Sequence, residues 1–238
     1  MNIRVSGGGF VTANGFGKLN DTLPLPLKKG TVEMPAVEQL FAKTGMPARF
    51  GRFDSFTKMG FAGAALALDD AGYRADKGSI CGMIVASFYD TVNTDKAYYE
   101  TTLEQDGFLS SPNLFSYTLP VIILGECCIV FSITGPAFCV GNERGREGLT
   151  ALKNAVRLIE SGKAAQMLVG WVDDPPQETD DPPVSIFVFL EGNVGDTDSK
   201  IIMHDWGCLS NGLNTEITSI MDLFKGETSR SFRRSQQS

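Results

Sequence analysis

The fold is decided by the stretch GPAFCVGNERGREGLTALKNAVRLIESGKAAQMLVG, residues 135–170. Apolar side chains recur at helical spacing in its middle and predict a helix over 148–161 that stops at Gly162. Those apolar residues are Leu149, Leu152, Val156 and Ile159. Short apolar runs on both sides, 137–140 and 166–172, predict buried strands. Strand, helix and strand in this order are typical of a parallel sheet covered by helices.

Similar signals occur on both sides of this stretch. Residues 81–87 and 184–190 are apolar runs that predict two further strands. Residues 3–12 predict a first strand with a glycine-rich break, and the glycine triplet indicates a close approach of backbones near the sheet edge. A long helix is expected over 53–71, with Gly72 as its stop. We therefore expect an α/β fold with a mainly parallel mixed sheet of about five strands and helices on both faces.

The composition excludes several classes of function. The chain has 238 residues, and 21 Lys and Arg against 28 Asp and Glu give a net charge of −7. Such an acidic chain lacks the basic surface that binds nucleic acids or anionic membranes. It has no apolar run long enough for a membrane span, and its five cysteines form no CxxC pair. With His204 as its one histidine, we expect a cytoplasmic protein without a metal site or cofactor.

An ordered set of short features lies between residues 110 and 172. Ser-Pro-Asn-Leu-Phe at 111–115 comes first, followed by Leu-Gly-Glu at 124–126 and Thr-Gly-Pro at 134–136. The strand, turn, helix and strand quoted above complete the set. In this order and spacing the chain resembles the N-terminal half of a β-ketoacyl synthase of the thiolase fold.

The resemblance implies where a nucleophile is expected. In this family a catalytic cysteine lies in the turn before the buried helix, where backbone N–H groups and the positive helix end stabilise a thiolate. Counting forward from Gly135-Pro136, that position is Arg144, and counting back from the helix it is Gly145. Neither is a cysteine. Ketosynthases also use two histidines from their C-terminal half, and His204 matches neither of them.

The resemblance therefore implies a non-catalytic subunit. The chain is similar to a chain length factor of the aryl polyene type, which pairs with a full-length ketosynthase, works with its acyl carrier protein and shapes the acyl tunnel. The residues that match the tunnel and interface segment are Leu114, Phe115, Thr118 and Ile122. A helix expected over 120–129 is apolar on nearly all sides. Because an exposed apolar helix is unfavourable, we expect a partner to bury it as well.

Two alternatives remain open. The chain could be a catalytically inactive homodimer that binds acyl chains or acts as a scaffold. It could also be an acyl enzyme that uses Cys139 as its nucleophile, although a buried core thiol is the simpler interpretation. We expect one domain over 1–223, a solvated acidic loop over 173–183 and a polar, disordered tail over 224–238.

Overall fold

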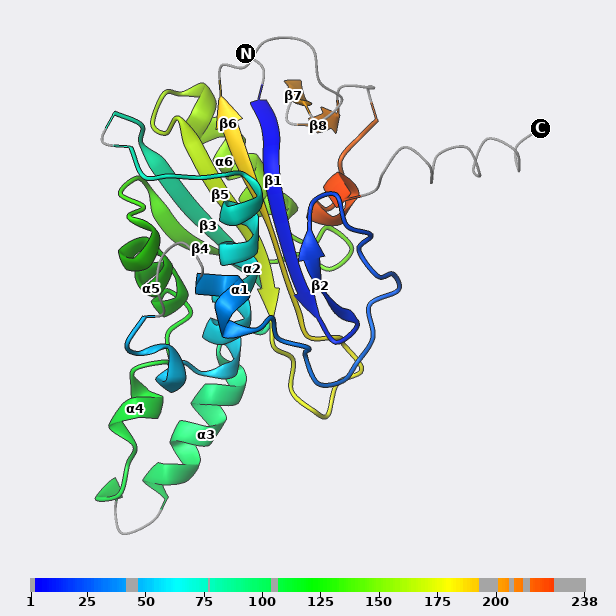
Figure 1. Cartoon of the computed structure of the whole chain (residues 1–238). Helices are drawn as coiled ribbons and strands as arrows, with labels where there is room; N and C mark the ends of the chain where they lie inside the picture. Colours follow the sequence, from blue (N-terminus) through cyan, green and yellow to red (C-terminus); the bar gives the residue numbers. More distant parts are fainter. Residues whose placement is uncertain are drawn as a thin grey trace, which may run out of the picture.

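The computed structural model describes residues 3–41, 47–76, 78–103, 107–192, 201–205, 208–211 and 215–224. Within them, eight strands form one sheet in the order β4-β3-β5-β6-β1-β7-β8, with β2 paired to β1 (Figure 1). The strands are β1 (Ile3–Thr12), β2 (Gly15–Lys18), β3 (Cys81–Ser87), β4 (Ala137–Gly141), β5 (Gln166–Asp173), β6 (Val184–Gly192), β7 (Ile201–Asp205) and β8 (Cys208–Asn211).

The strands β4-β3-β5-β6-β1 are the centre of the sheet. β3 pairs in parallel with β4 and β5, whereas β6 pairs antiparallel with both β5 and β1. Of these five strands, β6 therefore runs against the other four. The expected mainly parallel mixed sheet of about five strands is confirmed for this centre. The short strands β2, β7 and β8 extend it with antiparallel pairs.

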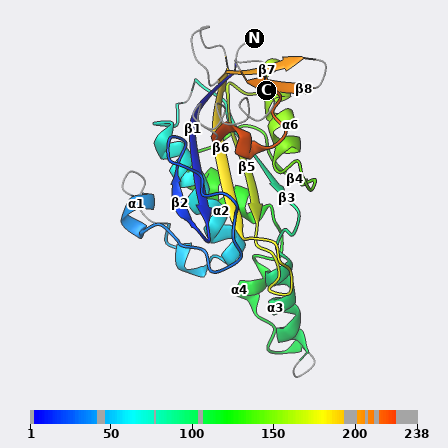
Figure 2. The ribbon, with the colours of Figure 1, turned by 90° about the vertical axis from the view of Figure 1, so that its right-hand side faces the viewer.

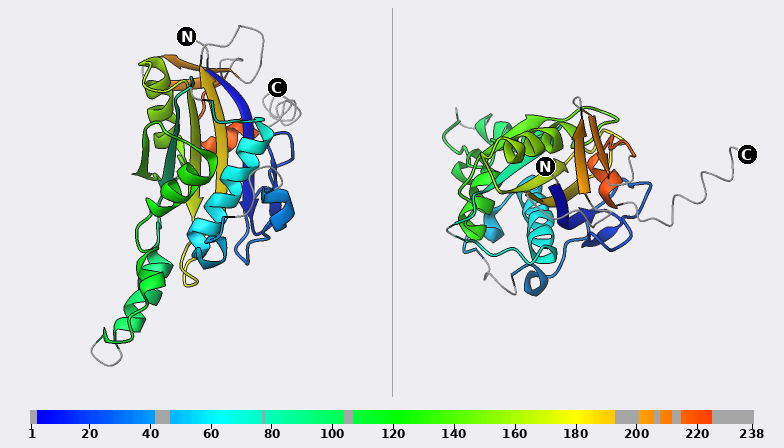
Figure 3. Two further views of the ribbon diagram at one scale, coloured as in Figure 1. Left: turned by 60° about the vertical axis from the view of Figure 1, so that its left-hand side comes forward. Right: turned by 90° about the horizontal axis from the view of Figure 1, so that it is seen from above.

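Helices cover both faces of the sheet, as expected (Figure 3). α2 (Ser55–Asp70) and α5 (Ile122–Phe131) pack on one face, and α6 (Leu149–Glu160) packs on the other. β3 lies between the two layers and is buried along its full length. The remaining helical segments are α1 (Val37–Phe41), η1 (Phe50–Arg52), α3 (Val92–Thr102), α4 (Pro112–Phe115) and η3 (Ile220–Phe224).

The glycine triplet of β1 allows α2 to lie directly on the sheet. A Cβ atom on Gly7 would lie 2.4 Å from the backbone N of Ala71, and one on Gly9 would lie 2.5 Å from the backbone O of Gly63. The triplet therefore marks a close approach of backbones. The expected close approach is thus confirmed. The expected break in the strand is wrong, because β1 continues through the triplet with one register shift between Val5 and Gly7.

The chain after β6 covers the rest of the α6 face. Side chains from its end, including Ile217, Ile220 and Phe224, belong to the same apolar cluster as α6. The backbone N–H of Ile220 also donates to the carbonyl O of Glu147, just before α6 (2.9 Å). Phe224 is the one described residue of the expected tail, and it is only 6% exposed. The rest of that tail lies outside the described residues.

α3 and α4 form a hairpin that projects beyond the sheet (Figure 2). Their side chains meet through the rings of Tyr98 and Phe115, whose centroids are 5.3 Å apart. At the base of the hairpin, the Thr94 hydroxyl donates to Asp54, which also caps α2 by accepting from the N–H of Thr57 (2.9 Å). No helix among the described residues is long and apolar enough to cross a membrane.

Candidate functional site

The expected nucleophile turn lies at the carboxyl edge of the sheet. The parallel strands β3, β4 and β5 all end there, and residues 142–148 lead from β4 into α6. The turn is held by its own side chains: Asn142 Oδ1 accepts from the N–H of Gly148 (2.9 Å), and Glu147 Oε1 accepts from the N–H of Gly145 (2.7 Å). Both glycines have positive φ angles, +72° for Gly148 and +78° for Gly145, which glycine adopts without strain.

Arg144 is the most strongly bonded side chain of this turn. Its guanidinium group lies 2.8 Å from Asp181 Oδ2 and donates to the Tyr89 hydroxyl (3.0 Å). It also lies over the Phe88 ring, 4.4 Å from the centroid. Hydrogen bonds to Asp181 and Tyr89 raise the pKa of Arg144 above its usual value, and the bond from Arg144 lowers the pKa of Asp181. The turn therefore holds a permanent cation.

Asp173 orients the aromatic side of this cluster. It is the last residue of β5 and is buried, and its Oδ1 accepts from the Ser87 hydroxyl (2.9 Å) and from the N–H groups of Phe88 (2.6 Å) and Tyr89 (2.9 Å). Its Oδ2 accepts from the Trp171 indole N–H (2.6 Å). Sequence reasoning missed Asp173 and Tyr89. An acidic residue at the end of a buried strand is the signal that would have indicated the first.

The acidic segment 173–183 is more ordered than a solvated loop. Asp173 belongs to β5, Asp181 pairs with Arg144, and Asp174 accepts through its carbonyl O from the Asn93 side chain (2.9 Å). Glu178 pairs with Lys96 (3.1 Å). The expectation of a solvated loop is therefore wrong for its two ends, because they contact the hairpin and the nucleophile turn.

Cys139 does not face this turn. Its neighbours in β4, Phe138 and Val140, pack against the α6 cluster, whereas Cys139 packs against the α2 and α5 cluster on the opposite face. Burial, followed by the nearby carboxylate of Asp90, raises the pKa of the Cys139 thiol to about 12. The side chain of His204, in β7, lies outside the described residues.

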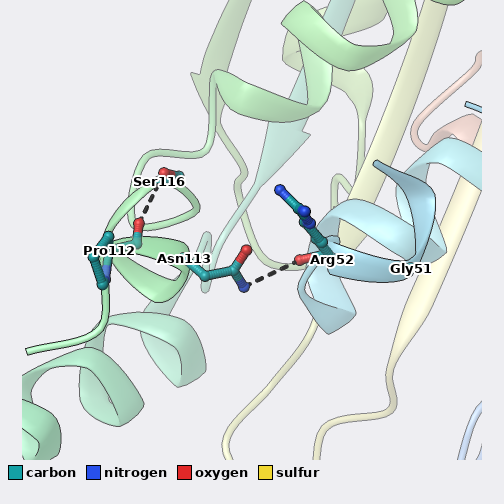
Figure 4. Close-up of a pocket in the computed structure, with 5 residues that line it drawn as sticks. All are labelled: Gly51, Arg52, Pro112, Asn113 and Ser116. Carbon is teal, nitrogen blue, oxygen red and sulfur yellow. Dashed lines mark hydrogen bonds between the residues drawn. The ribbon is translucent and has the colours of Figure 1, made fainter. Parts of the chain in front are cut away.

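The four expected tunnel and interface residues lie along one segment, and none of them lines the hollow beside α4. Phe115 in α4 is 60% exposed and Leu114 is partly exposed. Thr118 donates through its hydroxyl to the carbonyl O of Phe115 (2.9 Å), and Ile122 packs against the core at the start of α5. The hollow of about 720 Å³ beside α4 is lined by other residues (Figure 4), namely Gly51, Arg52, Pro112, Asn113 and Ser116.

The hairpin, α5 and the segment between them expose many large apolar side chains, which together we call the apolar surface. Large apolar side chains in this part of the chain are about half exposed or more. They are Tyr99, Leu103, Phe108, Leu109, Phe115, Leu119, Val121 and Ile129. Single exposed apolar residues are ordinary, but such a concentration is typical of a protein–protein interface. The predicted helix that is apolar on nearly all sides is confirmed as α5.

Residues 28–179 match the family model described as Beta-ketoacyl synthase, N-terminal domain. No curated protein matches the chain.

Several solved structures share the fold. The ishigamide ketosynthase/chain length factor matches with a TM-score of 0.60 and 14% identity over 80% of this chain, which spans 62% of the length of that one. The complex of the ketosynthase ApeO with its chain length factor ApeC from Xenorhabdus doucetiae matches with a TM-score of 0.55 and 14% identity, over 82% of this chain and 81% of that one. A type II PKS ketosynthase with its acyl-carrier protein, AntDE:AntF, has a TM-score of 0.57 and 15% identity, over 80% of this chain and 62% of that one.

Proposed function

The chain belongs to the β-ketoacyl synthase family, and we propose that within it the chain is a non-catalytic chain-length-factor subunit that pairs with a full-length ketosynthase. The observation that carries the proposal is the nucleophile turn. By the count from the family's motifs, the cysteine position falls on Arg144, which is ion-paired, or on Gly145. A guanidinium group whose pKa is raised by Asp181 has no lone pair with which to accept an acyl group.

The exposed apolar surface supports the pairing. The surface along α3, α4 and α5 is concentrated on one flank, and β4 is the end strand of the sheet on the same side (Figure 1). An unpaired strand edge next to exposed apolar side chains makes an isolated chain prone to aggregate. A partner that buries the edge and these side chains removes this tendency. Chain length factors occur in the names of two structures with this fold, which favours a ketosynthase as that partner.

In this complex the subunit would carry out no bond chemistry. A growing chain on an acyl carrier protein would extend into an apolar tunnel of the ketosynthase, and side chains of this subunit would close its far end. Phe115 and Leu114 are our candidates for that closure, with Thr118 and Ile122 beside them, because α4 presents them outside the core. The aryl polyene type of product and the cytoplasm as location belong to the same proposal.

The structure gives little support to an acyl enzyme that uses Cys139. A thiol with a pKa of about 12 is almost entirely protonated at neutral pH, and this side chain lies on the face of the sheet opposite α6. It therefore lacks the helix end that activates the family's cysteine. An inactive homodimer remains the second candidate, since a second copy could also cover the apolar surface.

The deciding experiment is co-expression of the tagged chain with each full-length ketosynthase from the same genome, followed by size-exclusion chromatography. We expect a stable complex of one copy of each chain with one of these ketosynthases, and acyl extension only when the complex and a loaded carrier protein are combined. Replacing the ketosynthase's own nucleophile should abolish extension, whereas Cys139→Ser should leave it unchanged. A stable self-dimer with no bound ketosynthase would favour the homodimer instead.

A further inference from the structure

A short hinge joins the hairpin of α3 and α4 to the sheet. Residues 88–91 lead from the end of β3 directly into α3, and Asp90 among them has a φ angle of +49°, in the left-handed region. None of the hairpin's described residues, 92–103 and 107–115, belongs to an apolar core cluster, and Thr94 is the one of them that is buried. Apolar packing in the core therefore does not fix how the hairpin stands on the sheet (Figure 2).

Polar contacts with the acidic segment 173–183 hold the hairpin from one side. The side-chain N–H of Asn93 donates to the carbonyl O of Asp174 (2.9 Å), and Lys96 pairs with Glu178 (3.1 Å). Lys96 and Glu178 are both well exposed, so their ion pair alone restrains the hairpin weakly. The orientation of the hairpin therefore depends on how firmly the acidic segment and the hinge are themselves held.

Arg144 contacts the hinge and the acidic segment at the same time. Its guanidinium group donates to the Tyr89 hydroxyl (3.0 Å) and lies 4.4 Å from the centroid of the Phe88 ring, and both of these residues belong to the hinge. The same group pairs with Asp181 of the acidic segment (2.8 Å), and the Tyr89 hydroxyl donates to Asp181 as well. The nucleophile turn, the hinge and the acidic segment therefore meet at one cation. Because this cation binds two acceptors and a ring, losing it removes several restraints together.

We propose that Arg144, Tyr89 and Asp181 form a latch, the arginine latch, that fixes the orientation of the hairpin relative to the sheet. Arg144 is then a positioning residue, which acts on the hairpin through the hinge and contacts no acyl chain. The consequence for a partner rests on the proposed function, in which the hairpin is part of the apolar surface that meets the ketosynthase. Without the latch the hairpin would sample further orientations. A binding orientation that is populated for only part of the time weakens binding in proportion.

The latch is tested on the full chain alone, through the distance between α3 and α6. Spin labels attached through a ketone-bearing amino acid at Tyr99 and Arg157, which are both exposed, leave the native cysteines untouched. Double electron–electron resonance should give one narrow distance distribution for the wild type and a distribution at least about twice as wide for Arg144→Gln. Arg144→Lys keeps a cation that can pair with Asp181 and should stay close to the narrow width. Arg146→Gln, an exposed position of the same turn, is the control and should not change the width.

Two further measurements separate positioning of the hairpin from stabilisation of the fold. Arg144→Gln should lower the melting temperature by no more than about 3 °C, because its side chain is exposed and the ion pair is screened. Its affinity for the ketosynthase should fall about 10-fold, as expected if the binding orientation is populated for about a tenth of the time. Tyr89→Phe removes the shared hydroxyl and should widen the distribution and weaken binding in the same direction.

The outcomes separate the latch from the proposed function. A distribution for Arg144→Gln as narrow as that of the wild type would overturn the latch. So would a distribution for Arg144→Lys as wide as that for Arg144→Gln, because the charge would then have no effect. If the distribution widens as expected but the wild type binds none of the co-expressed ketosynthases, the proposed function fails and the latch stands. If it widens and Arg144→Gln still binds the ketosynthase as tightly as the wild type, the effect of the latch on pairing is overturned.

Discussion

Helices α5 and α6 pack on opposite faces of one sheet, yet their outer surfaces differ in kind. α6 buries Leu152 and Val156 against the sheet and turns polar residues such as Thr150 and Arg157 outward, so it is amphipathic. α5 also buries one side, but its outer side carries Val121 and Ile129. The apolar inner face of α6 is buried by the chain itself, whereas the apolar outer face of α5 is left exposed.

The segments around these two helices differ in the same way: those beside α6 are packed by the chain's own residues, and those beside α5 are left exposed. On the α6 side, η3 packs Ile220 and Phe224 beside the helix, and the Arg144–Asp181 pair occupies the turn at its start. On the α5 side, the sheet ends at β4 and the hairpin exposes further apolar residues. On the proposed function, the turn that holds the nucleophile in the family is filled here by the chain's own residues, and the α5 side is the region that contacts another protein.

The largest effect is expected where the chain completes its own core. Phe224→Ala should lower the free energy of unfolding by about 3–5 kcal/mol, because it removes a buried ring that packs on Gly8 and Phe10. Chemical denaturation followed by circular dichroism measures this. Met221→Ala in the same segment is the control and should cost less than half as much, since Met221 is only partly buried. A loss below about 1 kcal/mol for Phe224→Ala would show that the α6 face does not depend on this segment.

The next effect is expected on the α5 side and should appear in binding alone. Ile129→Lys places a charge in the centre of the proposed interface, and we expect binding to the ketosynthase to weaken about 100-fold while the melting temperature of the free chain stays the same. Titration calorimetry and thermal melts measure the two quantities. Thr150→Lys, on the polar side of α6, is the control and should change neither. Equal binding by the Ile129 and Thr150 variants would place the interface elsewhere.

The sequence predicted most of the fold because apolar periodicity is a local signal. The runs at β3, β5 and β6 and the spacing of Leu149 to Ile159 depend only on neighbours in the chain, and the structure confirms them. The interruption of β1 was predicted wrongly for a related reason. A glycine triplet breaks a strand in isolation. The close backbone approach expected at the triplet is confirmed, but only the packing of α2 shows which element makes it.

The site was less accessible to sequence reasoning. Counting from the family's motifs leads to Arg144, but not to its partners. Tyr89 is 55 residues away from Arg144 in the sequence. Asp181, which bonds to both, is 92 residues away from Tyr89. Such pairs depend on how the hairpin and the acidic loop fold back, which no local pattern encodes. The roles of Leu114, Phe115, Thr118 and Ile122 stay predictions, because they concern a tunnel in another subunit.

A moderate effect is expected on the product of the complex. Phe115→Ala and Leu114→Ala remove bulk from α4, so the acyl tunnel should be longer and the products should gain one or more extension steps. Mass spectrometry of the chains released from the carrier protein measures this. Ser116→Ala, at an exposed position of the same segment, is the control and should leave the distribution unchanged. Unchanged products from both apolar variants would remove Leu114 and Phe115 from the tunnel while leaving the pairing intact.

The smallest effect is expected at the nucleophile turn. Arg144, and then Tyr89, lower the pKa of Asp181, so this carboxylate stabilises the folded chain above its unfolded pKa, and the contribution is lost as the pH falls through the lower, folded value. Asp181→Asn should therefore lower the melting temperature at pH 7 by no more than about 3 °C, because the pair is exposed to solvent and screened. The difference from the wild type should shrink below about pH 4. Asp180→Asn is the control, since Asp180 is fully exposed and lies 3.8 Å from Lys29. A difference that persists at pH 3 would mean that the amide disturbs the loop in some way other than through the lost charge.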